Sequence, residues 1–305
     1  MDQKKNIAKL QKRVQKHFAD FVAMPYVVEN FRDEPCAYYD QYLKGDDDCA
    51  YVVTRTNELY TWHLSQYANG VLNRGEYSLD DLAFAARYAW ANANFAQAFA
   101  DAGKRGALII WESVLFLSLS ILVGWKTESA SIGKAIVRGL DTTLLGLRHT
   151  AEHEAGSLYR HFWFLLQLYC QANKIRLDTS EYSYPEDMSP YADVLADWRT
   201  TDLAKVEGFV NVMADFHLNH ARFAAHDEVD EFDVEDTMLF PHEILSFLRM
   251  REWAGLSNPN QFEHPLMRHP LARLPEPVPL AKPSTPLLDA VIAKFRTEFP
   301  GSFQD

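Results

Sequence analysis

The sequence has little of what several large classes of protein require. Its three cysteines, Cys36, Cys49 and Cys170, are odd in number and far apart, which indicates neither a disulfide framework nor a CxxC site. Only 13 of the 305 residues are glycine, and alternating Val, Ile and Thr are scarce, which argues against an all-β fold. The first 22 residues carry positive charge without the apolar run of a signal peptide. Together these absences favour a cytoplasmic protein.

Several catalytic and membrane signatures are also missing. The chain contains no GxSxG, GxxxxGK[ST] or GxGxxG motif. One apolar stretch, residues 106–125, is about 20 residues long, as a membrane span would be. Glu112 lies within it, however, and a carboxylate is costly in hydrocarbon. We therefore expect no association with a membrane, and interpret this stretch as the central helix of a bundle.

Apolar residues recur instead at helical spacing from one end of the chain to the other. The first stripe is Ile7, Leu10, Val14, Phe18 and Phe21, and later stripes end at glycines or begin at prolines. The connections between them are mostly short. This pattern predicts an all-α fold, a single-domain array or bundle of about ten helices, with a helical core over residues 1–264.

The exception to the helical pattern is the segment 265–286. It holds half of the chain's 14 prolines, and proline blocks helix interiors. Because it also carries leucines that need burial, we expect an extended strap over the bundle rather than a disordered linker. Residues 287–305 are predicted to form a last, C-terminal helix.

Negative charge is concentrated in one part of the chain. The net charge is −12, but the segment 177–248 holds 17 acidic residues against three basic ones. The density is highest in "HDEVDEFDVEDT", residues 226–237. Like charges this close destabilise a folded chain unless something offsets them. The segment is therefore either a solvated loop or a surface that attracts a basic partner.

Apolar side chains interleave with these acids, as at a protein interface. Calcium is a further alternative, although the spacing does not match an EF-hand. Direct nucleic-acid binding is disfavoured, because this surface would repel phosphate. The candidate partner-binding residues are Asp227, Glu228, Asp230, Glu231, Phe232, Asp233, Glu235 and Asp236.

A second candidate site is the motif H-x-x-E-H at His149, Glu152 and His153. Histidines at i and i+4 share a helix face and can bind one zinc ion, and the glutamate can activate the bound water. A third ligand would be Glu228 or a member of the Asp215, His217 and His220 cluster. A non-peptidase metal site formed by His149, His153, His217 and His220 is another alternative. Peptidases with this motif build the site beside a sheet, and none is predicted here, so we favour surface or structural histidines and expect no cofactor.

Three segments resemble a known family of helical proteins. They are "ARYAWANANFAQAFADAG", "YADVLADWRTTDLAKVEGFV", and "LFPHEILSFLRMREWAGL" followed by "HPLMRHPLARLP". Over residues 80–290 the pattern resembles the immunity protein 49 family, whose members neutralise toxins exchanged between bacteria, as in type VI secretion.

The resemblance implies an immunity (antitoxin-like) protein without catalysis of its own, which binds a cognate toxin. The toxin would be a basic protein such as a nuclease, whose phosphate-binding face is cationic, and the acidic surface would cover that face. No binding residues carry over, because members of the family bind through differing surfaces. The alternatives are a metal-dependent helical hydrolase using His149, Glu152 and His153, or a helical protein-interaction adaptor.

Overall fold

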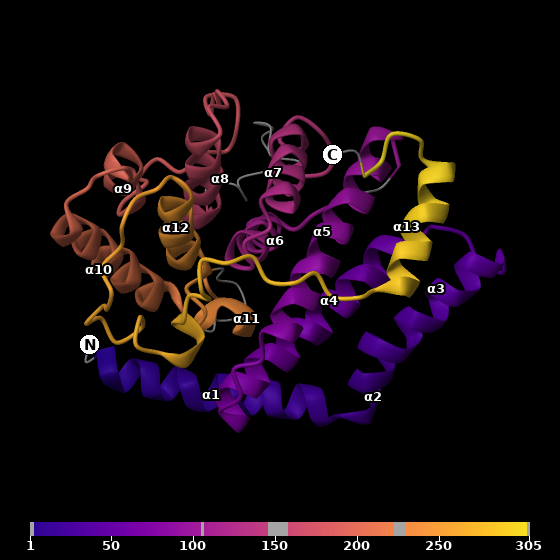
Figure 1. Ribbon diagram of the computed structural model, residues 1–305, viewed down its shortest axis with the longest axis horizontal. Helices are drawn as coiled ribbons and strands as arrows, with labels where there is room; N and C mark the ends of the chain where they lie inside the picture. Colours follow the sequence, from indigo (N-terminus) through magenta and orange to yellow (C-terminus); the bar gives the residue numbers. More distant parts are fainter. Residues whose placement is uncertain (1–2, 105–106, 146–157, 223–229, 304–305) are drawn as a thin grey trace.

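The computed structural model describes residues 3–104, 107–145, 158–222 and 230–303, which form helices joined by turns and extended segments (Figure 1). No β-strand occurs among these residues, so the predicted all-α fold class is confirmed. The α-helices are α1 (Gln3–Ala23), α2 (Pro25–Val28), α3 (Glu34–Lys44), α4 (Val52–Asn69), α5 (Leu79–Asp101), α6 (Ile110–Leu122), α7 (Lys126–Gly139), α8 (Arg160–Ala172), α9 (Tyr191–Asp197), α10 (Leu203–His220), α11 (Glu235–Met238), α12 (His242–Trp253) and α13 (Pro286–Glu298).

The helix α6 is the centre of the main core. All of its residues except Trp111 are buried, and it packs against α5, α7, α8 and α12. On α5 a run of buried alanines lets neighbouring helices approach closely, because a methyl group fills little space between helix axes. The apolar stretch therefore serves a protein core. None of the helices in the described parts of the chain is long and apolar enough to cross a membrane.

A second, smaller core joins the C-terminal helix to the N-terminal half. Tyr42 of α3, Phe95 of α5 and Phe295 of α13 are all buried there. The rings of Phe95 and Phe295 meet edge to face with centroids 4.7 Å apart, a favourable geometry for aromatic pairs. Helix α13 ends at Glu298, and the residues after it turn back toward α5.

The proline-rich segment runs as the predicted extended strap between α12 and α13 (Figure 1). Its own side chains Leu266 and Leu271 are buried, and a single 3-10 turn over Pro270–Ala272 interrupts the extended segment. Its backbone bonds directly to the core: the Leu280 N–H donates to the carbonyl of Val123 at 2.9 Å. The prolines thus deny this segment a helix, and its leucines hold it in place.

Two buried arginines of α12 fix the extended segments on either side of that helix. Arg249 Nη2 donates to the carbonyls of Pro275 at 2.6 Å and Glu276 at 3.0 Å. Arg251 Nη2 donates to the carbonyls of Thr200 at 3.0 Å and Ser257 at 2.8 Å. Both side chains are almost fully buried, so the guanidinium groups depend on these carbonyls for their hydrogen bonds.

We expect Arg249→Met to destabilise the protein by about 2–3 kcal/mol, because the substitution leaves two strap carbonyls without a donor. Urea unfolding followed by circular dichroism measures this change. Arg268→Met is the matched control, since Arg268 is exposed and should change the stability by less than about 0.5 kcal/mol. Equal unfolding midpoints for the two variants would show that the strap does not depend on Arg249.

Candidate functional site

The acidic segment predicted as a partner-binding surface is largely internal. Asp227 and Glu228 lie outside the described residues. Asp230, Glu231 and Phe232 are only 7%, 5% and 0% exposed. The expectation that these three side chains form a surface is therefore wrong, and the reason is that basic and aromatic groups from distant helices enclose them.

Glu231 is held at the N-terminus of α8. Its Oε1 accepts from Arg160 Nε at 2.8 Å, and its Oε2 accepts from the His161 backbone N–H at 3.0 Å. The ring Nδ1 of His161 lies 3.1 Å from the same Oε2. Burial by itself would raise the pKa of Glu231, but the hydrogen bonds and charge of His161 and Arg160 hold that pKa below its ordinary value. Glu231 is thus an ionised, internally paired carboxylate.

Asp230 is paired in the same way with the end of α10. His220 Nδ1 lies 2.5 Å from Asp230 Oδ1, and Arg222 forms an ion pair with Oδ2. The carboxylate also accepts the Glu231 backbone N–H at 3.0 Å. Two successive acidic residues therefore tie α8 to α10.

Phe232 lies among three histidine rings. Its ring stacks on His217 with centroids 3.9 Å apart, and His161 and His242 lie at 4.7 and 6.4 Å. Burial lowers the pKa of His242 to about 3, so this ring is neutral, and its Nδ1 lies 3.0 Å from Ser118 Oγ. Phe232 is a core residue rather than a surface anchor.

His217 cannot serve the predicted metal site. Its Nδ1 is 2.8 Å from Glu243 Oε1, and its Nε2 is 3.1 Å from the carbonyl of Thr237, so both ring nitrogens are engaged inside the core. His220 is engaged with Asp230. His149, Glu152 and His153 lie outside the described residues. Within the described ranges, no group of three or more His, Cys, Asp or Glu residues could hold a metal ion.

The last three acidic residues, Asp233, Glu235 and Asp236, are only partly exposed. Glu235 lies 3.6 Å from His17 of α1, which places α11 against the N-terminal helix. Burial raises the pKa of Asp236 to about 7, and the Glu235 carboxylate adds to the shift. Burial likewise raises the pKa of Glu112 on α6 to about 7, with a further contribution from Asp236. The acids of α11 therefore belong to a contact between helices and form no continuous outer face.

The ion pairs of Glu231 and Asp230 adjoin the surface in a groove between α8 and α10. Two adjoining hollows of about 390 and 380 Å³ share Arg160 and His220. Their walls hold five carboxylates against two guanidinium groups. We name this feature the α8–α10 groove; its lining residues are Leu158, Arg160, Pro185, Glu186, Asp187, Ser189, Pro190, Val212, Asp215, Phe216, Asn219, His220, Arg222, Asp230 and Glu231.

The groove combines an acidic rim with apolar side chains open to solvent. Glu186 and Asp187 are exposed, and the Ser189 N–H donates to Asp187 at 2.8 Å, which lowers the pKa of that carboxyl. Leu158 is 47% exposed and Val212 is 45% exposed. Sequence reasoning missed these residues, although Glu186 and Asp187 belong to the acidic segment 177–248 and Val212 falls outside the apolar stripe of its helix.

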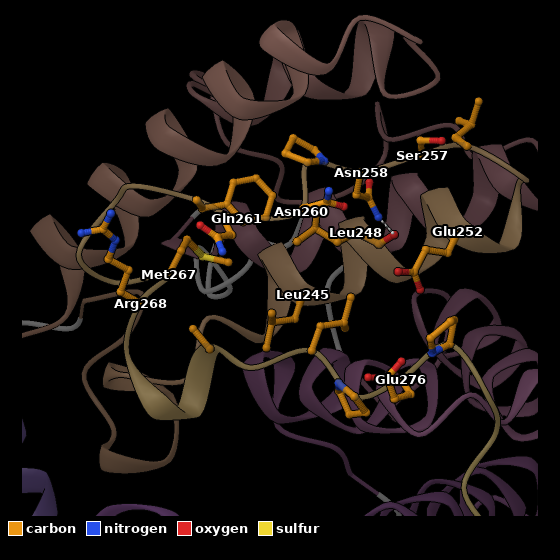
Figure 2. A pocket seen from close by; sticks show the side chains of 17 residues that line it. Leu245, Leu248, Glu252, Ser257, Asn258, Asn260, Gln261, Met267, Arg268 and Glu276 are labelled. Carbon is orange, nitrogen blue, oxygen red and sulfur yellow. Dashed lines mark hydrogen bonds between the residues drawn. The ribbon is translucent and has the colours of Figure 1, made fainter.

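A larger cavity of about 840 Å³ lies between α12, residues 256–262 and the strap (Figure 2). Its polar walls serve the fold: Glu252 accepts from Arg249 at 2.6 Å, and Asn258 accepts from Arg251 at 2.9 Å while donating to the carbonyl of Leu248. The α8–α10 groove is the stronger candidate for a binding site, because it adds exposed acidic and apolar side chains to the groups that are paired internally.

Comparison of the chain with protein-family models, with curated proteins and with solved structures finds no match. The relation to the immunity protein 49 family, expected from three sequence segments, therefore stays a prediction.

We expect Glu231→Gln to destabilise the protein by about 3–5 kcal/mol at pH 7. The substitution leaves the side chains of His161 and Arg160 without the carboxylate that pairs with them. A carboxyl with a lowered folded pKa adds stability above its unfolded pKa of about 4.3, and loses it as the pH falls through the folded value. The difference in the free energy of unfolding between the variant and the unmodified protein should therefore become smaller below about pH 4. Denaturant titrations at several pH values measure this difference, and Glu186→Gln, at an exposed position, is the control. A difference that does not change with pH would contradict an ionised Glu231.

The pH dependence of stability that Asp236 causes should have the opposite sign to that of Glu231. Because its folded pKa is raised, the folded state keeps a proton that the unfolded chain has released, and stability falls as the pH rises from about 4 to about 7. We expect Asp236→Asn to flatten this decline, as measured by melting temperature against pH. Asp233→Asn, on the same segment, is the control and should leave the slope unchanged; an unaltered slope in Asp236→Asn would mean that this carboxyl is not protonated in the fold.

Proposed function

We propose that this chain is a cytoplasmic binding protein, without catalysis of its own, that neutralises a basic bacterial toxin. The observation that carries the proposal is the α8–α10 groove, where an excess of carboxylates surrounds exposed apolar side chains. Acidic groups at the rim accelerate association with a cationic partner, and apolar groups within it provide area to bury. The proposed toxin-binding surface is therefore this groove, and not the continuous acidic surface expected from the sequence.

The carboxylates of the groove already bind guanidinium groups of the chain itself. Glu231 holds Arg160, and Asp230 holds Arg222. Glu186 and Asp187 lie on the same walls, with exposed side chains. Arginine or lysine side chains of a toxin would pair with these outer acids, in the way the deeper acids pair internally. A nuclease suits this arrangement, because the face that holds phosphate is cationic.

The packing of Phe216 adds a second feature of a protein-binding surface. The Arg160 guanidinium carbon lies 4.4 Å from the centroid of the Phe216 ring, and the centroid of the His220 ring lies 4.3 Å from it. These contacts restrict the Phe216 side chain in the lining of the groove. A restricted side chain loses less entropy on binding, which favours the tight association that neutralisation requires.

The experiment is to co-express and purify the chain with the product of the adjacent gene, since immunity genes lie beside their toxin genes. The double variant Glu186→Lys/Asp187→Lys should slow association by roughly 10-fold or more and abolish protection of toxin-producing cells. Surface plasmon resonance at two salt concentrations measures the association rate, which should fall at high salt for the unmodified protein.

The matched control is Asp40→Lys/Asp46→Lys, which makes the same charge change at exposed positions on and just after α3, at the other end of the molecule (Figure 1). Equal association rates and equal protection for the two double variants would show that the groove is not the interface. Stoichiometric zinc in the purified protein, lost on His149→Ala, would favour the metal-dependent hydrolase instead.

A further inference from the structure

A small cavity lies apart from the α8–α10 groove, where the start of α7 meets the ends of α8 and α12 and the turn after α9. Its volume is about 220 Å³. The chain has 42 acidic residues against 30 basic ones, yet none of the residues that line this cavity is acidic. The lining residues are Lys126, Ser129, Ala130, Tyr169, Ala172, Asn173, Trp198, Arg199, Met250, Trp253 and Ala254.

The walls of the cavity are mainly apolar and partly aromatic. Trp253, Ala130 and Ala172 line it and are each partly exposed, so their side chains can contact a bound molecule. Tyr169 and Met250 also line it but are buried. An apolar cavity of about 150 Å³ is enough to bind benzene. The cavity therefore has room for an aromatic ring with a small substituent.

The polar groups in the lining are mostly bonded within the protein. Tyr169 Oη donates to the carbonyl of Ala130 at 3.3 Å, and Trp198 Nε1 donates to Gln171 Oε1 at 3.0 Å. Asn173 Nδ2 donates to the carbonyl of Tyr169 at 2.9 Å. A ligand is therefore selected by the apolar walls and by the charges beside them.

Those charges are two exposed cations, Lys126 and Arg199. The Arg199 guanidinium carbon lies 4.1 Å from the centroid of the Trp198 ring, and its Nη2 donates to the carbonyl of Gln171 at 3.3 Å. Lys126 Nζ lies 5.4 Å from the centroid of the Trp253 ring. Neither cation forms an ion pair with any residue that the structure describes. The aromatic rings hold both cations near the cavity, and their charge stays available to an anion.

We infer that this cavity binds a small aromatic carboxylate, of one ring or two fused rings. The ring would lie against Trp253, between Ala130 and Ala172, where burial of apolar surface stabilises it. The carboxylate would lie at the exposed side of the cavity and pair with Arg199 and Lys126. No acidic lining residue opposes it there. The inference does not depend on the proposed toxin binding, because this cavity and the α8–α10 groove share no residue.

The test is isothermal titration calorimetry of the full chain with benzoate, indole-3-carboxylate, the two corresponding neutral carboxamides, and acetate. At least one aromatic carboxylate should bind with a dissociation constant below about 1 mM. Its carboxamide and acetate should each bind about 10-fold more weakly or worse, because the first lacks the charge and the second lacks the ring. Absence of binding by both aromatic carboxylates at about 10 mM would overturn the inference. A carboxamide or acetate that binds as tightly would overturn it too.

Removal of the two cations tests their part in binding. Lys126→Gln/Arg199→Gln should weaken binding of the aromatic carboxylate about 10-fold or more and leave the affinity for the carboxamide unchanged. Lys9→Gln/Lys12→Gln removes the same charge at exposed positions on α1, and should change neither affinity. If the two double variants bind the carboxylate equally well, the cations at the cavity do not hold it.

Two further variants alter the walls without changing any charge. Ala130→Leu should fill part of the cavity and weaken both the carboxylate and the carboxamide about 10-fold or more. Trp253→Leu removes the aromatic wall and should also weaken both, which keeps the inference testable if Ala130→Leu disturbs the packing of α7. Circular dichroism confirms that each variant is folded. Undiminished carboxylate affinity in both variants would place the ligand elsewhere and contradict the inference.

Discussion

The pairing of buried carboxylates with histidine and arginine side chains holds together the C-terminal half of this protein. Glu231 is bound by Arg160 and His161, Asp230 by His220 and Arg222, and Glu243 by His217. A buried charge requires partners that replace its hydration: both oxygens of Glu231 and of Asp230 have such partners, and Oε1 of Glu243 has the His217 ring. The remaining features of this half, including the stacking of Phe232 and the shape of the groove, follow from where those partners lie.

Because the densest acidic segment is used internally, the outer electrostatics depend on other residues. The rim of the α8–α10 groove is acidic through Glu186, Asp187 and Asp215. The position of this rim does not follow from the net charge of the chain. It depends on the packing of α8 and α10, which places these acids beside the exposed side chains of Leu158 and Val212.

Much of the fold is readable from residue patterns. The apolar stretch 106–125 becomes the buried α6, the glycine at 75 ends a helical segment with a positive φ of 67°, and Pro286 begins α13. The strap follows from its prolines and leucines. The site was harder to predict, since a run of Asp and Glu looks the same in a sequence whether solvent or buried histidines surround it.

The sequence by itself determined the helices, the strap and the excess of acid over residues 177–248, because these depend on local spacing and composition. The tertiary structure alone decided which acids are inside. Arg160 and Glu231 are 71 positions apart and meet at 2.8 Å, and Ser118 and His242 are 124 positions apart and meet at 3.0 Å. No local pattern encodes such pairs, because the packing of whole helices brings them together.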